Sequence, residues 1–183
     1  MRRSAVVLLL GVTLLAPSAT ATSAASASAG PVDTAGPAHG TSQGATAATA
    51  ASGTFTIAAD FTTLSASPAA HGRHCTVTLQ GVLTFTGTLE GGAEGSITAR
   101  ILAPCDQALA SPPGTFRDVF RFTGGFEGAI GGVTASGALT YAGVTSPGGS
   151  IGAVIRLRGT STAVLRADAA VGVGGSYTGV ARP

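Results

Sequence analysis

Residues 83–102 read Leu-Thr-Phe-Thr-Gly-Thr-Leu-Glu-Gly-Gly-Ala-Glu-Gly-Ser-Ile-Thr-Ala-Arg-Ile-Leu, with alternating side chains on both sides of a glycine-rich centre. A period of two is typical of a strand with one buried and one exposed face. The stretch therefore predicts a β-hairpin that turns at residues 91–95. Its Phe-Thr-Gly-Thr-Leu-Glu-Gly at 85–91 returns 37 positions later as Phe-Thr-Gly-Gly-Phe-Glu-Gly at 122–128, with five of seven positions identical.

The same alternation recurs through residues 53–183 and gives eight candidate strands and no convincing helix. An even number of strands lets the first and last pair antiparallel, which removes exposed edges. We therefore predict an all-β fold, an eight-stranded antiparallel up-and-down β-barrel. The connections after strands 1, 3, 5 and 7 are the longer ones, at residues 65–74, 104–114, 142–149 and 168–175. They predict a loop-rich mouth at one end and a tight base at the other.

The amino terminus has the composition of an export signal. A basic Met-Arg-Arg precedes an apolar run at residues 5–16, and Ala19-Thr20-Ala21 offers a small-x-small cleavage site. The apolar run is too short for a membrane span, which needs about 20 residues. We predict a signal peptide at residues 1–21, with residue 29 as the later alternative for cleavage, and therefore a secreted protein.

Residues 22–52 consist almost wholly of Ala, Ser, Thr, Gly and Pro. Such a segment buries too little apolar surface to offset the entropy of ordering, so it is predicted to be a disordered linker. Residues 53–183 then form the β-domain. This domain has eight Arg, seven Asp or Glu and no Lys, scattered along the chain. That balance excludes a concentrated basic face for nucleic acid, and no membrane partner is expected after signal removal.

The chain has two cysteines, Cys75 and Cys105. An even count in an exported protein favours a disulfide, because the compartment is oxidising. Both cysteines would lie at the mouth, on either side of the hairpin of strands 2 and 3. The other interpretation is a pair of buried thiols.

Several short motifs resemble the allene oxide cyclase-like barrel group, which includes the dirigent-like proteins. They are Gly-Thr-Phe at 53–55, the run at 83–91, and Phe-Glu-Gly at 126–128 followed by Gly132 and Ser136-Gly137. They are most similar to small bacterial domains of unknown function. The resemblance implies an eight-stranded barrel with a hydrophobic cavity, often oligomeric in plants. No catalytic residue of the plant enzymes matches a position in this chain.

Two groups of residues are candidates for a site. The first is a polar cluster expected at the mouth, which either binds a ligand or forms an ordinary surface loop: His71, Arg73, His74 and Asp106. Its spacing matches no standard zinc motif, so no metal is assigned. The second comprises aromatic residues that either line a cavity or fill the core: Phe85, Phe122, Tyr141 and Tyr177.

Glu90 and Glu127 occupy equivalent positions in the repeat and raise the idea of an acid–base pair. Their polar face and adjacent turn glycines favour exposed carboxylates at the base instead. The sequence as a whole favours a barrel that binds a small apolar molecule, with cofactor-free cyclisation or isomerisation as the reaction if it is an enzyme. The alternative is a non-catalytic secreted interaction or structural module with a filled barrel. The oligomeric state stays open.

Overall fold

The computed structural model describes residues 47–183, which form one antiparallel sheet of eight strands and one short helix. The predicted all-β fold with eight antiparallel strands is confirmed. The predicted signal peptide and residues 22–46 of the predicted linker lie outside the described residues. The elements in chain order are β1 (Thr49–Ala69), β2 (His74–Gly87), β3 (Leu89–Ile101), α1 (Cys105–Ala110), β4 (Asp118–Ile130), β5 (Val133–Thr145), β6 (Ser150–Gly159), β7 (Thr162–Ala170) and β8 (Gly174–Arg182).

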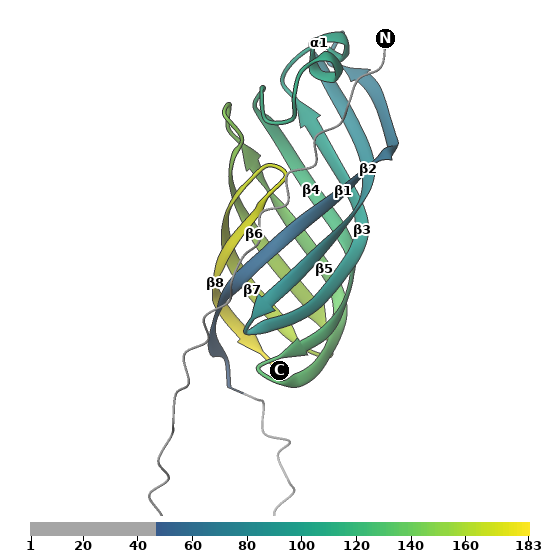
Figure 1. Ribbon diagram of the computed structural model, residues 1–183. Coiled ribbons are helices and arrows are strands. Elements are labelled where there is room, and N and C mark those ends of the chain that lie inside the picture. Colours follow the sequence, from purple (N-terminus) through teal and green to yellow (C-terminus); the bar gives the residue numbers. More distant parts are fainter. Residues whose placement is uncertain (1–46) are drawn as a thin grey trace, which may run out of the picture. The chain divides into compact units, whose positions relative to one another are not determined.

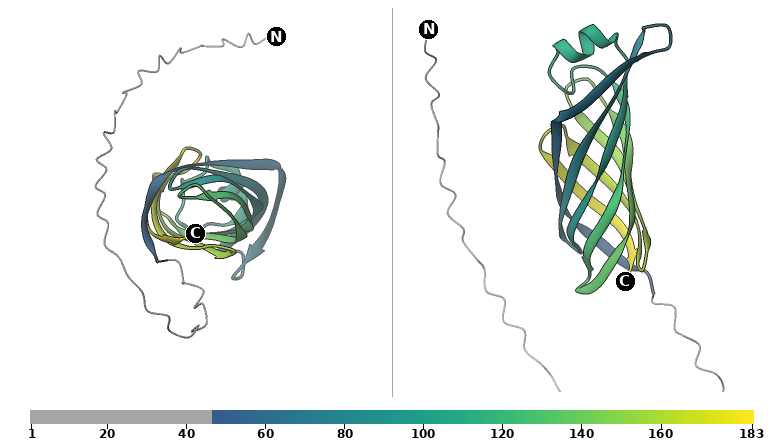
Figure 2. Two further views of the ribbon diagram at one scale, coloured as in Figure 1. Left: turned by 90° about the horizontal axis from the view of Figure 1, so that it is seen from below. Right: turned by 90° about the vertical axis from the view of Figure 1, so that its right-hand side faces the viewer.

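Each strand pairs with the next along the chain, and β8 pairs with β1, so the strand order closes on itself. The view from below in Figure 2 shows the strands arranged around a common centre. Apolar side chains alternate inward along each strand, as in Leu83 and Phe85 of β2, while their Thr neighbours are exposed. This period of two is the pattern from which the strands were predicted.

The two ends of the closed sheet differ in their connections, as predicted. One end, here called the base, has the connections after β2, β4 and β6, which contain only one or two residues. The other end, the mouth, has the connections after β1, β3, β5 and β7, which are all longer. Figure 1 shows α1 at the mouth and the C-terminus at the base.

The hairpin of β2 and β3 turns earlier than the sequence predicts. β2 ends at Gly87 and β3 begins at Leu89, so the predicted turn at residues 91–95 is wrong and those residues belong to β3. The turn is fixed by Thr88, whose backbone N–H donates to the carbonyl of Ser52 at 2.9 Å. The Ser52 N–H donates in return to the Thr88 hydroxyl at 3.0 Å. A Thr-mediated contact with a distant strand cannot be seen in local sequence.

The repeated glycines serve close approach of neighbouring strands rather than turning. Gly91 lies opposite Gly128 in the β3–β4 ladder. A Cβ atom built on Gly91 would lie 2.7 Å from the Gly128 Cα, which is closer than side chains tolerate. Gly95 and Gly124 form a second such pair, with a corresponding distance of 2.6 Å. Paired glycines let strands bend tightly where a sheet coils.

Two further elements differ from the sequence prediction. β1 begins at Thr49 rather than at Gly53, and it continues through the predicted loop to Ala69. A register shift between Asp60 and Ser65 interrupts its pairing with β2, and Asp60 accepts hydrogen bonds from the backbone N–H and hydroxyl of Thr62 there. The shift hid the continuation of the strand, because it breaks the alternation.

The second difference is α1, which lies in the predicted loop 104–114. Its backbone bond from the Ala108 N–H to the Pro104 carbonyl measures 2.9 Å, and Asp106 lies in its first turn. A carboxylate in the first turn favours a helix through the helix dipole. Six residues are too few to display a helical period, so the sequence pattern did not reveal it.

Candidate functional site

The base of the closed sheet is filled by aromatic side chains. The Phe85 ring lies 6.0 Å from the rings of Phe126 and Tyr177, measured between centroids, with edge-to-face geometry. Phe85, Phe126 and Tyr177 are each at most 2 % exposed. Edge-to-face contacts of this kind add to the stability that burial provides. The base therefore offers no room for a ligand.

The hydroxyl of Tyr177 is fully used within the base. It accepts a hydrogen bond from the Leu89 N–H at 2.9 Å and donates to the Thr86 carbonyl at 3.1 Å. These bonds secure both sides of the tight Thr88 turn. Burial raises the pKa of the Tyr177 hydroxyl, so the side chain stays neutral. Its role in this structure is to close the base.

The mouth half of the sheet contains a cavity of about 540 Å³. This volume falls within the range typical of small-molecule sites. Its lining comes from six of the eight strands, β1 to β6, and from two mouth connections. The apolar members are Ile57, Ala59, Phe61, Leu83, Ile97, Ala99, Pro113, Phe120, Phe122, Ile151, Val171 and Gly172, and the polar ones are Asp118, Tyr141 and Thr145.

The floor of the cavity marks the boundary between the two halves. On β2, β4 and β5 the lining ends at Leu83, Phe122 and Tyr141. The next inward position toward the base on β2 is Phe85, which belongs to the aromatic cluster described above. On β2 the cavity therefore ends at Leu83, and the filled base begins at the next inward-facing residue, Phe85.

The cavity lies beside a stretch of β1 that has only one partner strand. Pairing between β1 and β8 ends at Phe55 opposite Gly175, whereas pairing between β1 and β2 extends to Ala69, with an interruption at residues 61–64. Residues 56–69 therefore have a free edge on the β8 side. Phe61, in this stretch, is 58 % exposed although it lines the cavity.

A second hollow of about 320 Å³ lies under α1 and the rest of the β3–β4 connection. Leu109 of α1 and Phe116 line it on one side, and Val77 and Leu79 of β2 on the other. Seven residues line both hollows, so the two are contiguous: Ala59, Phe61, Ile97, Ala99, Pro113, Asp118 and Val171. The β3–β4 connection therefore covers one side of the cavity.

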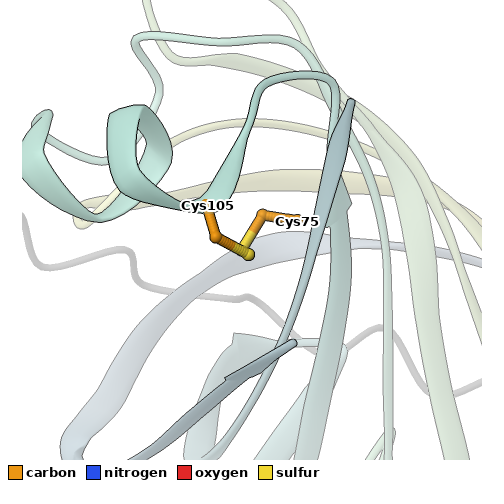
Figure 3. The surroundings of a disulfide bond; sticks show 2 residues. All are labelled: Cys75 and Cys105. Atoms are coloured by element: carbon orange, nitrogen blue, oxygen red, sulfur yellow. A yellow bond between two sulfur atoms is a disulfide. The ribbon is translucent and has the colours of Figure 1, made fainter. Parts of the chain in front are cut away.

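The predicted disulfide is confirmed, and it fixes that cover. Cys75 is the second residue of β2 and Cys105 is the first residue of α1, with 4.7 Å between their Cα atoms. Figure 3 shows the bond joining the start of the helix to the strand. The early turn of the β2–β3 hairpin places Cys75 opposite Ile101, which is only four residues before Cys105.

Three polar side chains interrupt the apolar wall of the cavity. Asp118 begins β4, and its register partner on β5 is Thr145, which is 2 % exposed. Burial raises the pKa of the Asp118 carboxyl, while a hydrogen bond with Thr145 acts in the opposite direction. The carboxyl oxygen Oδ1 is buried and has no hydrogen-bond partner. An unpaired buried carboxyl oxygen is costly and calls for an explanation.

Tyr141 is the third polar residue, near the floor. Its ring lies 5.4 Å from that of Phe55 and 5.0 Å from that of Phe120, between centroids. Its hydroxyl is buried without a hydrogen-bond partner, and burial raises the pKa of this group. Tyr141 thus differs from Tyr177, whose hydroxyl is bonded on both sides.

The structure places the predicted site residues in three groups. Phe122 and Tyr141 line the cavity, whereas Phe85 and Tyr177 lie in the filled base. The polar cluster lies at the mouth beside the disulfide: His71 and Arg73 in the β1–β2 turn, His74 at the start of β2, and Asp106 in α1. None of these four lines either hollow of the described residues.

Asp118 and Thr145 were missed, although the sequence contained a signal for them. Asp118 lies at an inward-facing position of β4, as Phe120 and Phe122 do, and Thr145 lies on the same face of β5 as Tyr141. A carboxylate on an otherwise aromatic face is unusual. Glu90 and Glu127, by contrast, are exposed, as expected from their place on the polar face of the alternating pattern.

A comparison with models of protein families finds no match to this chain, and a comparison with curated proteins finds none either. Within residues 47–183 no helix is long and apolar enough to cross a membrane. In the same range, no group of three or more His, Cys, Asp or Glu side chains is arranged to hold a metal ion.

Proposed function

We propose that this protein is a secreted β-barrel of the allene oxide cyclase-like type that binds a small apolar molecule in the mouth half of the barrel. The observation that carries the proposal is the apolar cavity of about 540 Å³ between the filled base and the covered mouth. Apolar surface of this extent favours a ligand that is itself mostly apolar.

Binding alone accounts for the cavity, and one class of reaction is compatible with it. Cyclisation or isomerisation of a bound molecule needs orientation and exclusion of water more than it needs a cofactor. The β3–β4 connection, tied to β2 by the disulfide, would supply that exclusion. The disulfide also supports export, because such bonds persist in oxidising compartments.

Native mass spectrometry of protein purified from its host tests the binding function directly. We expect a retained small molecule, recovered in repeated preparations. A fluorescent apolar compound, N-phenyl-1-naphthylamine, provides a second readout because its emission rises in apolar surroundings. Absence of a retained ligand together with no binding of this compound would favour the alternative, a non-catalytic interaction module.

A matched pair of variants locates the binding site. Ala99 lines both hollows, whereas its neighbour Thr98 is exposed on the outer face of β3. We expect Ala99→Phe to weaken binding of N-phenyl-1-naphthylamine by about tenfold or more, because the added ring occupies cavity volume. Thr98→Phe adds the same ring outside and should leave binding unchanged. Equal effects of the two variants would place the binding site elsewhere.

Export has its own test. The protein recovered from the culture medium should begin after residue 21 or after residue 29, as read by N-terminal sequencing. A protein retained in the cell with Met1 intact would contradict secretion.

A further inference from the structure

The cavity is apolar except at a few positions, and two of its polar atoms have no partner within the protein. The structure contains three buried side-chain atoms of this kind among residues 47–183, and two of them, Asp118 Oδ1 and the Tyr141 hydroxyl, belong to residues that line the cavity. Buried polar atoms nearly always have partners in native proteins. Two unpaired atoms on one cavity therefore point to a ligand group that pairs with them.

Asp118 is the more accessible of the two residues. It is only half-buried, and it lines both contiguous hollows. Tyr141 is 2 % exposed, and its ring is packed against Phe55 and Phe120. A ligand group thus reaches Asp118 with less rearrangement of the wall.

The position of Asp118 also sets the orientation of a ligand. Asp118 is the first residue of β4, at the mouth, and Phe122 lies four residues further toward the floor. At about 3.3 Å per residue, the two positions are separated by roughly 13 Å along the strand. A ligand whose polar group lies at Asp118 would therefore extend its apolar body toward the floor.

We propose that the ligand is an amphipathic molecule whose hydrogen-bond donor, a hydroxyl or amine group, binds the Asp118 carboxylate at the mouth while its apolar body fills the cavity. This inference rests on the proposed function and adds the chemical class of the ligand. An ionised carboxylate only accepts hydrogen bonds, so it selects for a donor and against an acceptor. The rest of the wall selects for apolar surface.

Three compounds of similar size separate this inference from the proposed function: 1-naphthol, which carries a donor, 1-methoxynaphthalene, which carries only an acceptor, and naphthalene. Their dissociation constants are measured by displacement of N-phenyl-1-naphthylamine at neutral pH. We expect the dissociation constant of 1-naphthol to be lower than that of 1-methoxynaphthalene by about tenfold or more, because a hydrogen bond to a charged group contributes at least this much affinity. A parallel arm with 1-naphthylmethanol and 1-naphthylmethylamine tells a hydroxyl donor from an amine donor.

Substitutions at Asp118 test the residue assignment. Asp118→Leu removes the acceptor, and we expect the preference for 1-naphthol over 1-methoxynaphthalene to disappear. Asp118→Asn is the second variant in case the leucine variant does not fold, and it should reduce the preference. Asp168→Leu is the matched control, because Asp168 is exposed on the outer face of β7 and lines neither hollow. This control should keep the full preference.

The outcomes distinguish the two proposals. If none of the compounds binds, the proposed function fails. If all bind equally well to the wild-type protein, the cavity is a binding site but the donor inference is overturned. A preference that survives in both Asp118 variants would also overturn it, because the donor would then bind elsewhere.

Discussion

The base and the mouth of the closed sheet are built from the same strands, yet they differ in how the interior is used. At the base, Phe85, Phe126 and Tyr177 interlock, and the Tyr177 hydroxyl is bonded to backbone on both sides. At the mouth, shorter side chains such as Ala59 and Ala99 face a hollow, and Tyr141 has an unbonded hydroxyl. The comparison indicates that side-chain packing in the interior stabilises the base, whereas the interior of the mouth half is available for binding.

The largest expected loss of stability comes from a substitution in the base. Phe85→Ala should destabilise the protein by about 3–5 kcal/mol, because it removes a buried ring and leaves a cavity. Phe61→Ala, at the mouth, removes a ring that is 58 % exposed and should cost about 0.5 kcal/mol or less. Urea denaturation followed by circular dichroism measures both. Similar costs for the two variants would mean that the halves do not differ in packing.

The disulfide is the main stabilising device at the mouth. Removing it by the double substitution Cys75→Ala and Cys105→Ala should cost about 3–4 kcal/mol on the chain-entropy model, given the sequence separation of 30 residues. Hydrogen exchange should rise most in α1 and the start of β2, while the base stays protected. Uniform deprotection of both halves would show that the mouth is not a separate region.

The hydroxyl groups of Tyr177 in the base and Tyr141 in the cavity wall allow the two halves to be compared at single atoms. Tyr177→Phe leaves the buried Leu89 N–H without its partner and should cost about 1–3 kcal/mol. Tyr141→Phe removes a hydroxyl that has no partner, so it should be neutral or slightly stabilising. Thermal unfolding of the two variants side by side gives the comparison. A large loss for Tyr141→Phe would mean that its hydroxyl is bonded in solution.

The smallest effect concerns Asp118 and depends on pH. Burial raises the pKa of its carboxyl above the ordinary value of 3.8, so the folded protein holds this proton more tightly than the unfolded chain does. The stabilising contribution of the protonated form is complete below that value and is lost as pH rises through the folded-state pKa. The Asp118→Asn variant has no carboxyl group at this position, so its stability does not fall in this way as the pH rises.

We therefore expect the stability advantage of Asp118→Asn over the wild type to grow as the pH rises from about 3 toward neutrality. The free energy of unfolding, measured by urea denaturation across this range, gives the difference between the two proteins. An advantage that shrinks with rising pH would contradict a raised pKa and would indicate that a partner stabilises the ionised carboxylate.

The strands were predictable because one face of each is buried, and burial leaves a period of two in the sequence. The alternation of Leu83, Thr84 and Phe85 is such a signal. The disulfide was predicted from an even number of cysteines in a chain with a predicted export signal. The turn at Thr88, the continuation of β1 past Asp60 and the short helix α1 were not predictable, because they depend on contacts with distant residues or are too short to show a period.

The candidate site was predicted only in part. The alternation of each strand predicted that Phe122 and Tyr141 face inward. It predicted the same for Phe85 and Tyr177, which fill the base, so it could not distinguish the two pairs. Whether an inward ring lines a cavity depends on the size of its neighbours across the interior, and the sequence does not give those neighbours. The polar wall residue Asp118 could have been found by asking which inward position carries a charge.

A crystal of the protein under xenon pressure tests the difference between the two halves most directly, because xenon enters apolar cavities and avoids packed cores. We expect xenon density in the mouth half, near Ile97 and Phe122, and none within the aromatic cluster of Phe85, Phe126 and Tyr177. Density inside that cluster, or a mouth half that takes up no xenon, would contradict a filled base beneath a binding cavity.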